Sequence, residues 1–408
     1  MKKQSPKIIN AKLASIWSKE KLRNIAPLRG GFAFKSEKFQ NTGIPIVRIS
    51  NIKFDGTVGG EFEYYSKIIP DEKFVLRGRS ILLAMSGATT GKIAMLDSEE
   101  EYYQNQRVGY FQNTGEVDYE FISSVLQTKA FTNQLNAVLV AGAQPNISSK
   151  EIDSFEFCIP DSIDEQSAIG FLFRTLDTLL SSYKDNLVNY QSFKATMLSK
   201  MFPKAGQTVP EIRLEGFKGE WEKSKLKDVA HRVQGNDGRM DLPTLTISAS
   251  GGWMNQIDRF SANIAGKEQK NYTLLKKGEL SYNHGNSKLA KYGVVFELQE
   301  YEEALVPKVY HSFRVNQLAD AKFIEIMFST KIPDRELGKL ISSGARMDGL
   351  LNISFDDFMN ISIIIPTIKE QQAIGSYFSN LDNLINSYQE KISQLEILKK
   401  KLLQDMFI

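Results

Sequence analysis

The chain has 408 residues, of which 42% are hydrophobic and 24% are charged, a composition typical of globular proteins with sizeable cores. At this length a single core is not expected, so the chain should fold into two or more domains. The formal net charge of +3 permits a nucleic-acid partner without requiring one.

Several classes of protein are disfavoured by what the sequence lacks. Its longest apolar runs, such as "ISIIIP" at 361–366, are far shorter than the roughly 18 residues of a membrane span, so we expect no membrane association. The opening residues "MKKQSPKIINAKLAS" contain no apolar stretch of the kind found in signal peptides. The single cysteine, Cys158, excludes an internal disulfide and fits a reducing compartment. We therefore expect a cytoplasmic protein.

Two blocks of mixed α/β character are predicted from the hydrophobic patterns. Short apolar or alternating runs predict strands in the first block at 44–50, 80–85, 92–96 and 107–111, and in the second block at 245–248, 292–298 and 361–365. Helical patterns lie at 119–135 and 321–332. Ser148 with Glu151, and Ser354 with Asp357, have the spacing of a capping box.

A long amphipathic helix is predicted after each block. Apolar residues recur in steps of three and four from Ile169 to Met201, and again from Ile374 to Leu402. Stripes of this kind predict helices of roughly 35–40 residues, about 55–60 Å long. Each helix is the obvious partner of the other, which predicts an antiparallel coiled coil. The alternative is that each helix lies on its own domain.

The chain contains an internal repeat of these elements. The segment "EQSAIGFLFRTLD" at 165–177 matches "EQQAIGSYFSNLD" at 370–382, and "WSKEKLRNIA" at 17–26 matches "WEKSKLKDVA" at 221–230. Each long helix follows an Ile-Pro pair and ends on Met-Phe. The centres of the blocks differ, which indicates one scaffold that carries two different readers.

The predicted fold class is therefore α/β (α+β), with two similar mixed α/β domains separated by two long antiparallel coiled-coil helices and an internal pseudo-twofold repeat. The expected order is a first domain, a helix, a Pro/Gly-rich linker, a second domain and a second helix, at 1–160, 161–203, 204–220, 221–366 and 367–408.

Catalytic motifs are weak throughout the sequence. "SGATTGK" at 86–92 resembles a phosphate-binding loop, but only three residues separate its glycines and Ile93 follows the lysine, whereas a Walker A motif has four residues and a Ser or Thr. "IPDRELGK" at 332–339 contains a nuclease-like Pro-Asp. The only histidines, His231, His284 and His311, are scattered singly, so no metal site is expected. Three alternative functions stay open: a P-loop-like enzyme, a nuclease, and a coiled-coil scaffold without DNA readout.

Polar and basic residues gather at several places in both blocks. Asn and Gln can pair with adenine, and Arg or Lys with guanine, while Ser, Thr and Lys can hold phosphates. The predicted DNA-binding residues of the first block are Arg48, Asn51, Lys53, Ser86, Thr89, Thr90, Lys92, Gln104, Asn105, Arg107, Gln144 and Asn146. Those of the second block are Asn283, His284, Asn286, Ser287, Lys288, Lys291 and Arg346.

The duplicated frame resembles the DNA specificity subunit of type I restriction-modification systems, a bacterial defence. The resemblance rests on the Trp-led openings, "GAQPNIS" at 142–148, the two Glu-Gln-x-Ala-Ile-Gly passages and the Met-Phe helix ends, and it covers essentially the whole chain. The second half departs from it, because "GARMDGLLNIS" at 344–354 lacks the Gln-Pro-Asn of the first half. A DNA contact at Arg346 therefore follows from its chemistry alone and not from the resemblance.

The resemblance implies a division of labour between subunits. Two target-recognition domains would each read half of a split site in double-stranded DNA, and the helices would set the gap and dock two methyltransferase subunits. The passages with Glu165, Gln166, Glu370 and Gln371 would then bind partners. S-adenosylmethionine would belong to the methyltransferases, and ATP and Mg to a separate restriction and translocase subunit. This chain would hold no cofactor and no catalytic residue.

Overall fold

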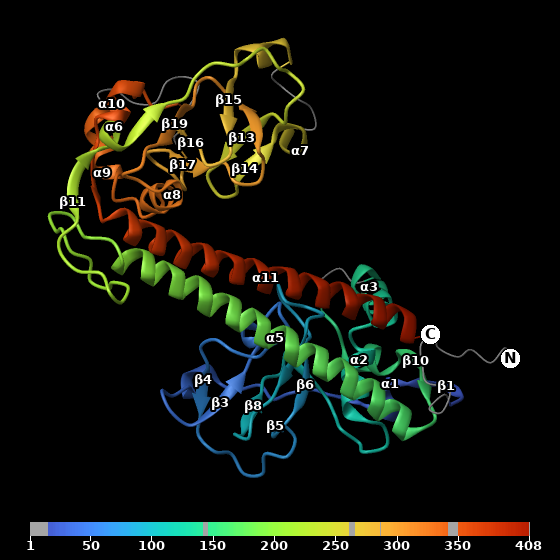
Figure 1. Cartoon of the computed structure of the whole chain (residues 1–408). Coiled ribbons are helices and arrows are strands. Elements are labelled where there is room, and N and C mark those ends of the chain that lie inside the picture. The colour runs from blue at the N-terminus through green and yellow to red at the C-terminus, as the bar shows by residue number, and fades with distance from the viewer. Residues whose placement is uncertain (1–14, 142–145, 261–265, 286, 342–349, 408) are drawn as a thin grey trace. The chain divides into compact units, whose positions relative to one another are not determined.

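The computed structural model describes residues 15–141, 146–260, 266–285, 287–341 and 350–407 (Figure 1). The chain divides into two compact units. Unit 1 comprises residues 1–184 and 390–408, and unit 2 comprises residues 185–389. The two long helices, α5 (Ile163–Lys200) and α11 (Ile368–Met406), each contribute one part to each unit.

Unit 1 is built from short strands and helices ahead of α5. Its strands are β1 (Trp17–Lys21), β2 (Leu28–Arg29), β3 (Ile44–Val47), β4 (Glu63–Tyr65), β5 (Val75–Leu76), β6 (Ser80–Ala84), β7 (Ile93–Leu96), β8 (Tyr102–Gln104), β9 (Val108–Phe111) and β10 (Glu156–Pro160). Its shorter helices are α1 (Leu22–Ile25), η1 (Ser36–Lys38), η2 (Ile49–Asn51), α2 (Tyr119–Val125), α3 (Lys129–Ala141) and α4 (Ser149–Asp153).

Unit 2 has the same order of elements at its start and end and a different order between them. Its strands are β11 (Glu222–Lys225), β12 (Ala230–Arg232), β13 (Leu245–Ser248), β14 (Gly252–Asn255), β15 (Thr273–Lys276), β16 (Leu280–Asn283), β17 (Val294–Glu297), β18 (Glu303–Val306), β19 (His311–Val315) and β20 (Ser362–Ile365). Its shorter helices are α6 (Leu226–Val229), α7 (Gln256–Phe260), η3 (Gly266–Asn271), α8 (Ala321–Ser329), α9 (Asp334–Leu340) and α10 (Phe355–Met359).

One four-stranded antiparallel sheet occurs in both units with the same topology. Its order is β2-β9-β6-β7 in unit 1 and β12-β19-β16-β17 in unit 2. Phe111 pairs with both Leu28 and Ile81, and Phe313 pairs with both Arg232 and Leu280. In each unit a further antiparallel pair, β1–β10 or β11–β20, joins the Trp-led segment to the strand that leads into the long helix.

The remaining strands differ between the units. Unit 1 forms a second four-stranded sheet, β4-β3-β8-β5, in which β3 and β8 are parallel. Unit 2 instead has the antiparallel pairs β13–β14 and β15–β18. The repeated frame and the divergent remainder confirm the predicted mixed α/β class with two similar domains and two long helices.

The two long helices run antiparallel in both units. In unit 1, Lys184 forms an ion pair of 2.8 Å with Glu396, and Lys399 pairs with Asp177. In unit 2, Lys194 pairs with Asp382, and the rings of Tyr190 and Tyr388 lie 5.3 Å apart. The antiparallel pairing expected from the apolar stripes is therefore present.

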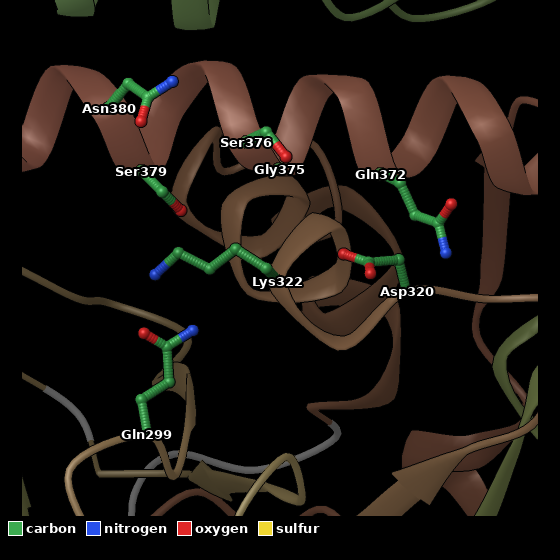
Figure 2. A pocket seen from close by; sticks show the side chains of 8 residues that line it. All are labelled: Gln299, Asp320, Lys322, Gln372, Gly375, Ser376, Ser379 and Asn380. Carbon is green, nitrogen blue, oxygen red and sulfur yellow. The ribbon is translucent and has the colours of Figure 1, made fainter.

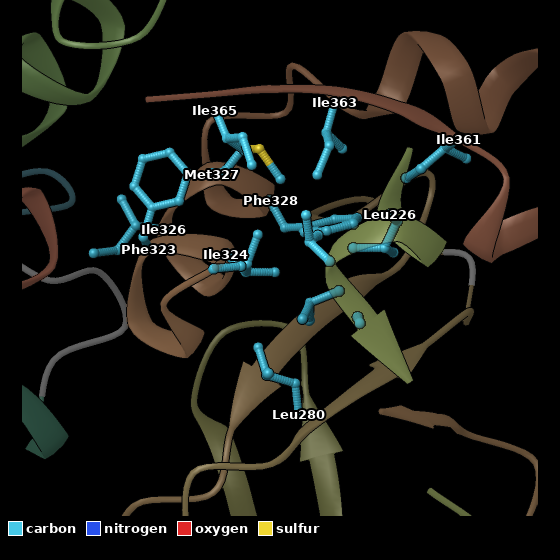
Figure 3. Close-up of a cluster of buried hydrophobic side chains, with 14 of the residues drawn as sticks. Leu226, Leu280, Phe323, Ile324, Ile326, Met327, Phe328, Ile361, Ile363 and Ile365 are labelled. Atoms are coloured by element: carbon cyan, nitrogen blue, oxygen red, sulfur yellow. The ribbon is translucent and has the colours of Figure 1, made fainter. Parts of the chain in front are cut away.

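Each unit has its main core where the repeated sheet meets the start of its long helix. In unit 2 the side chains of α8 fill the space between β20 and β16 (Figure 3). Five consecutive or near-consecutive residues of α8 are buried, Phe323, Ile324, Ile326, Met327 and Phe328. Apolar residues on more than one side of this short helix let it pack against the sheet and α11 at once.

The end of each long helix completes an aromatic cluster. In unit 2, Phe202 packs against Trp221, Phe323 and Phe378 at ring-centroid distances of 5.7, 5.6 and 6.5 Å. In unit 1, Phe407 packs against Trp17, Phe121 and Phe173 at 6.2, 5.6 and 5.8 Å. The repeated Met-Phe sequence is thus a core element in both units.

Three predicted elements need correction. The helix expected at 119–135 is two helices, because the hydroxyl of Thr128 bonds the carbonyl of Val125 and accepts from the amide of Phe131, which ends α2 and starts α3. The strand at 44–50 ends at Val47, where η2 follows. The helix at 321–332 ends at Ser329, close to Lys331 with its positive φ of 62°.

Candidate nucleic-acid interface

The predicted segments of unit 1 meet at one end of its sheets. The loop that joins β6 to β7 lies against η2, since the Thr89 hydroxyl donates to the carbonyl of Ile49 at 3.2 Å. The amide of Met85 donates to the carbonyl of Arg107, and the carbonyl of Met85 accepts from Ile147, both at 2.9 Å. These contacts make four segments neighbours in space: 48–54, 86–92, 104–107 and 146–147.

The basic and amide side chains at this end are mostly accessible. Lys92, Arg107 and Asn146 are exposed, and Lys53, Thr89, Thr90 and Asn105 are half-buried. The ammonium of Lys92 lies 4.9 Å from the ring centroid of Phe54, a cation–π contact that orders the long side chain. Side chains of this chemistry suit both phosphates and base edges.

Arg48 and Ser86 lie beneath this surface, and both are half-buried. Arg48 forms an ion pair of 3.3 Å with Glu63, which offsets part of its charge. Within the described residues, Nε of Arg48 and Oγ of Ser86 are buried atoms without a hydrogen-bond partner. Buried polar atoms without partners are rare in folded proteins, so each of these two atoms is a position where an external group could supply the missing bond.

Two predicted residues of unit 1 are framework residues. Gln104 is fully buried, and its amide nitrogen donates to the carbonyls of Arg29 and Val108 at 2.8 and 2.7 Å. Asn51 is buried and bonds the carbonyl of Glu61 at 2.8 Å. Because their polar atoms are used inside the unit, we remove both side chains from the candidate surface and assign them a structural role.

The predicted loop of unit 2 joins β16 to β17. Ser287, Lys288 and Lys291 are exposed on it. The ammonium of Lys291 lies 5.2 Å from the ring centroid of Tyr292. Asn283 is half-buried and shapes the base of the loop, because it donates to the carbonyl of Ile247 and accepts from the amide of Gly285.

The histidines are less scattered than their sequence positions indicate. The rings of His284 and His311 lie 4.7 Å apart. Each ring nitrogen of His284 is 2.9 Å from a carbonyl oxygen, Nδ1 from Leu351 and Nε2 from Val309. A neutral imidazole has one N–H, so it donates to one of these two carbonyls and the tautomer decides which. His284 is buried, and we assign it to the framework as well.

His311 stays neutral over a wider pH range. Burial lowers the pKa of His311 to about 4, against a bond to the carbonyl of Ile353 that raises it, and the charges of His284 and Arg232 lower it further. No group of three or more His, Cys, Asp or Glu residues suited to a metal occurs within the ranges that the structure describes.

Three predicted residues, Gln144, Asn286 and Arg346, lie outside the described residues. Two exposed apolar residues beside the loops were not predicted. Phe54 is 74% exposed and Leu289 is 63% exposed. A signal was present in the sequence, because each follows a lysine, Lys53 or Lys288, in a short segment rich in polar residues.

The enzyme alternatives find no support in the geometry. A Walker A loop opens a helix after a strand, whereas residues 86–92 connect the antiparallel strands β6 and β7. The segment is therefore the turn of a β-hairpin. Pro333 and Asp334 begin the short helix α9, and burial raises the pKa of the Asp334 carboxyl.

The Glu-Gln pairs at the starts of the long helices are buried in both units. Gln166 accepts from the amide of Asp118 at 2.9 Å and donates to the carbonyl of Pro160 at 2.8 Å. Gln371 makes the equivalent bonds to Asp320 and Pro366 at 3.0 and 2.8 Å.

The glutamates are held differently in the two units. Glu165 accepts from the indole of Trp17 and the amide of Ser15 at 3.0 and 2.7 Å. Glu370 is held bidentately by Arg213 at 2.8 and 2.7 Å. Contact of these buried side chains with a partner stays a prediction, and their role in the structure is to fix the helix starts.

The start of α11 borders a polar hollow of about 330 Å³ in unit 2 (Figure 2). It is lined by Gln299, Asp320, Lys322, Gln372, Gly375, Ser376, Ser379 and Asn380. In unit 1 the corresponding start of α5 instead lies beside an ion cluster in which Glu120 pairs with Arg79 and Arg174. The two helix starts therefore present different polar surfaces.

Among the described residues, no helix is both long and apolar enough to span a membrane.

Comparison with known proteins gives a consistent result. The family model described as type I restriction modification DNA specificity domain matches residues 15–190 and again residues 218–397. The specificity subunit of the type I restriction enzyme MjaVIII from Methanocaldococcus jannaschii is 26% identical over 175 residues, which is 40% of this chain and 40% of that protein. That alignment thus spans less than half of the length of the curated relative.

A solved structure shares the fold over nearly the whole chain. The S subunit of a type I restriction-modification system from M. genitalium matches with a TM-score of 0.62 at 15% identity, and the alignment covers 99% of both chains. At this identity the likeness is one of fold.

Proposed function

This chain belongs to the type I restriction modification DNA specificity domain family, and from this premise we propose that it is the non-catalytic, sequence-reading subunit of a type I restriction-modification complex. The observation that carries the proposal is the double match to one family model in a chain whose two units share a frame. The accessible Lys, Arg and Asn side chains at the loop end of unit 1, and the accessible Ser and Lys side chains on the loop of unit 2, support binding to double-stranded DNA.

We propose that the target is bipartite and asymmetric. The repeated sheet positions one set of loops in each unit, and the loop sequences differ between the units. Two recognition domains with different loops would bind two different half-sites. A continuous helical spacer such as α5 would fix the separation and the rotational phase of those half-sites along the duplex.

The proposed partners are two methyltransferase subunits, which would use S-adenosylmethionine, and restriction subunits, which would use ATP and Mg. Exposed apolar side chains along the long helices support docking there. Phe171 and Val188 on α5 are 70% and 59% exposed, and Ile397 on α11 is 66% exposed. Side chains of this kind contribute to a partner-binding surface where they gather into a contiguous apolar patch. We place the complex in the cytoplasm, where DNA is accessible.

The test is selection of duplex DNA by the full-length chain from a randomised library at roughly 100 mM salt, because non-specific binding to phosphates weakens as salt rises. We expect enrichment of two short half-sites at a fixed gap. Lengthening α5 and α11 together by four residues adds about 6 Å, so the preferred gap should grow by about two base pairs of 3.4 Å each.

Enrichment of no motif at all would overturn the reading role and favour a scaffold without DNA readout. An unchanged gap in the lengthened variant would overturn the spacer role while leaving sequence reading in place.

A further inference from the structure

We propose that two loops at equivalent positions carry the base-reading contacts, residues 85–92 between β6 and β7 for one half of the target and residues 287–293 between β16 and β17 for the other. This inference rests on the proposed function and identifies the elements that determine specificity within it.

The strand registers establish that the loops are equivalent. Leu83 pairs with Ile93 and Tyr282 pairs with Val295, each on the strand that occupies the third place in the repeated sheet. Each loop returns through a glycine in the left-handed region, Gly91 and Gly293, both with a φ of +84°. The two segments look unrelated in sequence, yet they form hairpins at the same place in the repeated sheet.

Each loop is also anchored by the same neighbouring segment. The carbonyl of Met85 accepts from the amide of Ile147, and the carbonyl of His284 accepts from the amide of Leu351, both at 2.9 Å. A single β-bridge follows in each unit, Ser86 with Asn146 and Gly285 with Leu350. The base of each hairpin is therefore fixed by a second strand-like segment.

The strands beneath the loops provide a rigid support. All five residues of β6 are buried, and Leu280, Ser281 and Tyr282 of β16 are buried as well. Binding side chains held on a packed scaffold keep their geometry better than those on unsupported loops. A change of side chain on the loop can therefore alter recognition without disturbing the core.

The chemistry of the loops suits base edges and differs between the units. Neither "MSGATTGK" at 85–92 nor "SKLAKYG" at 287–293 contains an Asp or a Glu. Lys92 and Lys291 are each held over an aromatic ring, at 4.9 and 5.2 Å.

Lysine is suited to the O6 and N7 acceptors of guanine. In the second loop, exposed Leu289 lies between Lys288 and Lys291, and an apolar side chain can contact the methyl group of thymine. We therefore expect guanine in both half-sites, with thymine beside it in the half read by unit 2.

The test uses the full-length chain and the same randomised duplex library. The variants are Lys92→Ala in the first loop and Lys291→Ala in the second, both at exposed positions that the core does not need. Matched controls are Lys73→Ala and Lys223→Ala, which remove exposed lysines elsewhere in the two units. We expect Lys92→Ala to relax one half of the selected motif and Lys291→Ala the other, each about 10-fold at one position, with the control motifs unchanged.

The inference is overturned if both loop variants select the wild-type motif, if both relax the same half, or if they only weaken binding uniformly, which would indicate phosphate contacts. In each of these cases the wild-type protein still selects a motif, so the proposed function stands. If the wild-type protein selects nothing, the proposed function fails and the inference fails with it.

Discussion

The indole nitrogen of Trp17 donates to the carboxylate of Glu165 at 3.0 Å, but the equivalent pair in unit 2, Trp221 and Glu370, has been separated. Glu370 is bound by Arg213 instead. Within the described chain, the buried Nε1 of Trp221 has no hydrogen-bond partner. The same glutamate position thus anchors the opening tryptophan in one unit and the segment before it in the other.

This difference predicts unequal costs for the same substitution. Glu370→Gln leaves the guanidinium of Arg213 without its counter-charge in a site where the glutamate is 1% exposed, and breaking a buried ion pair costs about 3–5 kcal/mol. Glu165→Gln disturbs hydrogen bonds without stranding a cation, at about 1–3 kcal/mol. Calorimetric unfolding of the two variants tests the order. Equal losses would show that the Arg213 contact adds nothing beyond a hydrogen bond.

The glycines of the Ala-Ile-Gly passages predict a second contrast. A Cβ on Gly170 would lie 2.6 Å from the amide nitrogen of Phe121 and 2.8 Å from the carbonyl carbon of Glu120. A Cβ on Gly375 would meet only side-chain atoms, at 3.2 Å from Asp320 and 3.4 Å from Lys322.

Alanine is favoured over glycine in a helix by about 1 kcal/mol, which offsets the milder contact at Gly375. We expect Gly375→Ala to be nearly neutral and Gly170→Ala to destabilise by about 1–3 kcal/mol through forced movement of α5 away from α2. Thermal unfolding followed by circular dichroism measures both. A neutral Gly170→Ala would mean that the backbone yields easily there.

The aromatic clusters predict that truncations at the helix ends act on different units. Phe202→Ala should destabilise unit 2 by about 3–5 kcal/mol, because the ring is 2% exposed and its removal leaves a cavity. Phe407→Ala should act on unit 1 through its contacts with Trp17 and Phe121. Hydrogen exchange resolved by segment distinguishes the two. Faster exchange in the same unit for both variants would contradict the assignment of the rings.

The neutral imidazole of His311 makes the stability of unit 2 depend on pH. Its folded pKa is about 4, below the ordinary value of 6.5, so between these values the unfolded chain binds a proton that the folded chain does not. The contribution of His311 to the free energy of unfolding is fully present above pH 6.5. It falls as the pH drops towards 4, by about 1.4 kcal/mol per pH unit. His311→Gln can still donate to the carbonyl of Ile353 but cannot titrate.

We therefore expect the His311→Gln variant to lose much of this acid sensitivity in unit 2, measured by urea unfolding at pH 7, 6 and 5. His231→Gln, a change at an exposed histidine, is the control and should keep the wild-type slope. An unaltered slope in His311→Gln would assign the acid sensitivity to other groups.

The elements that could be predicted from the sequence are those set by local patterns. The stripe from Ile169 to Met201 predicts α5, and the capping box of Ser148 and Glu151 forms as the spacing indicates. The break at Thr128 was missed because the apolar period continues through it, and only the hydrogen bonds of the threonine hydroxyl decide the end of α2.

The site was harder to predict because exposure depends on distant partners. Asn51 and Gln104 have the same side-chain chemistry as Asn146, yet only Asn146 is exposed. The side-chain oxygen of Gln104 accepts a hydrogen bond from Arg29, which lies 75 residues earlier in the chain. The pairing of His284 with His311 also required the register of β16 on β19, which no local pattern specifies.

The cluster around Phe407 has a consequence for the order in which the protein matures. The core of unit 1 includes Met406 and borders Leu402 and Phe407, residues that the ribosome adds only after all of unit 2. The aromatic ring of Phe202, which belongs to the core of unit 2, is synthesised before any strand of that unit. Unit 1, which is synthesised first, therefore completes its hydrophobic core last. A nascent chain stalled inside α11 would carry a unit 1 whose core lacks these side chains.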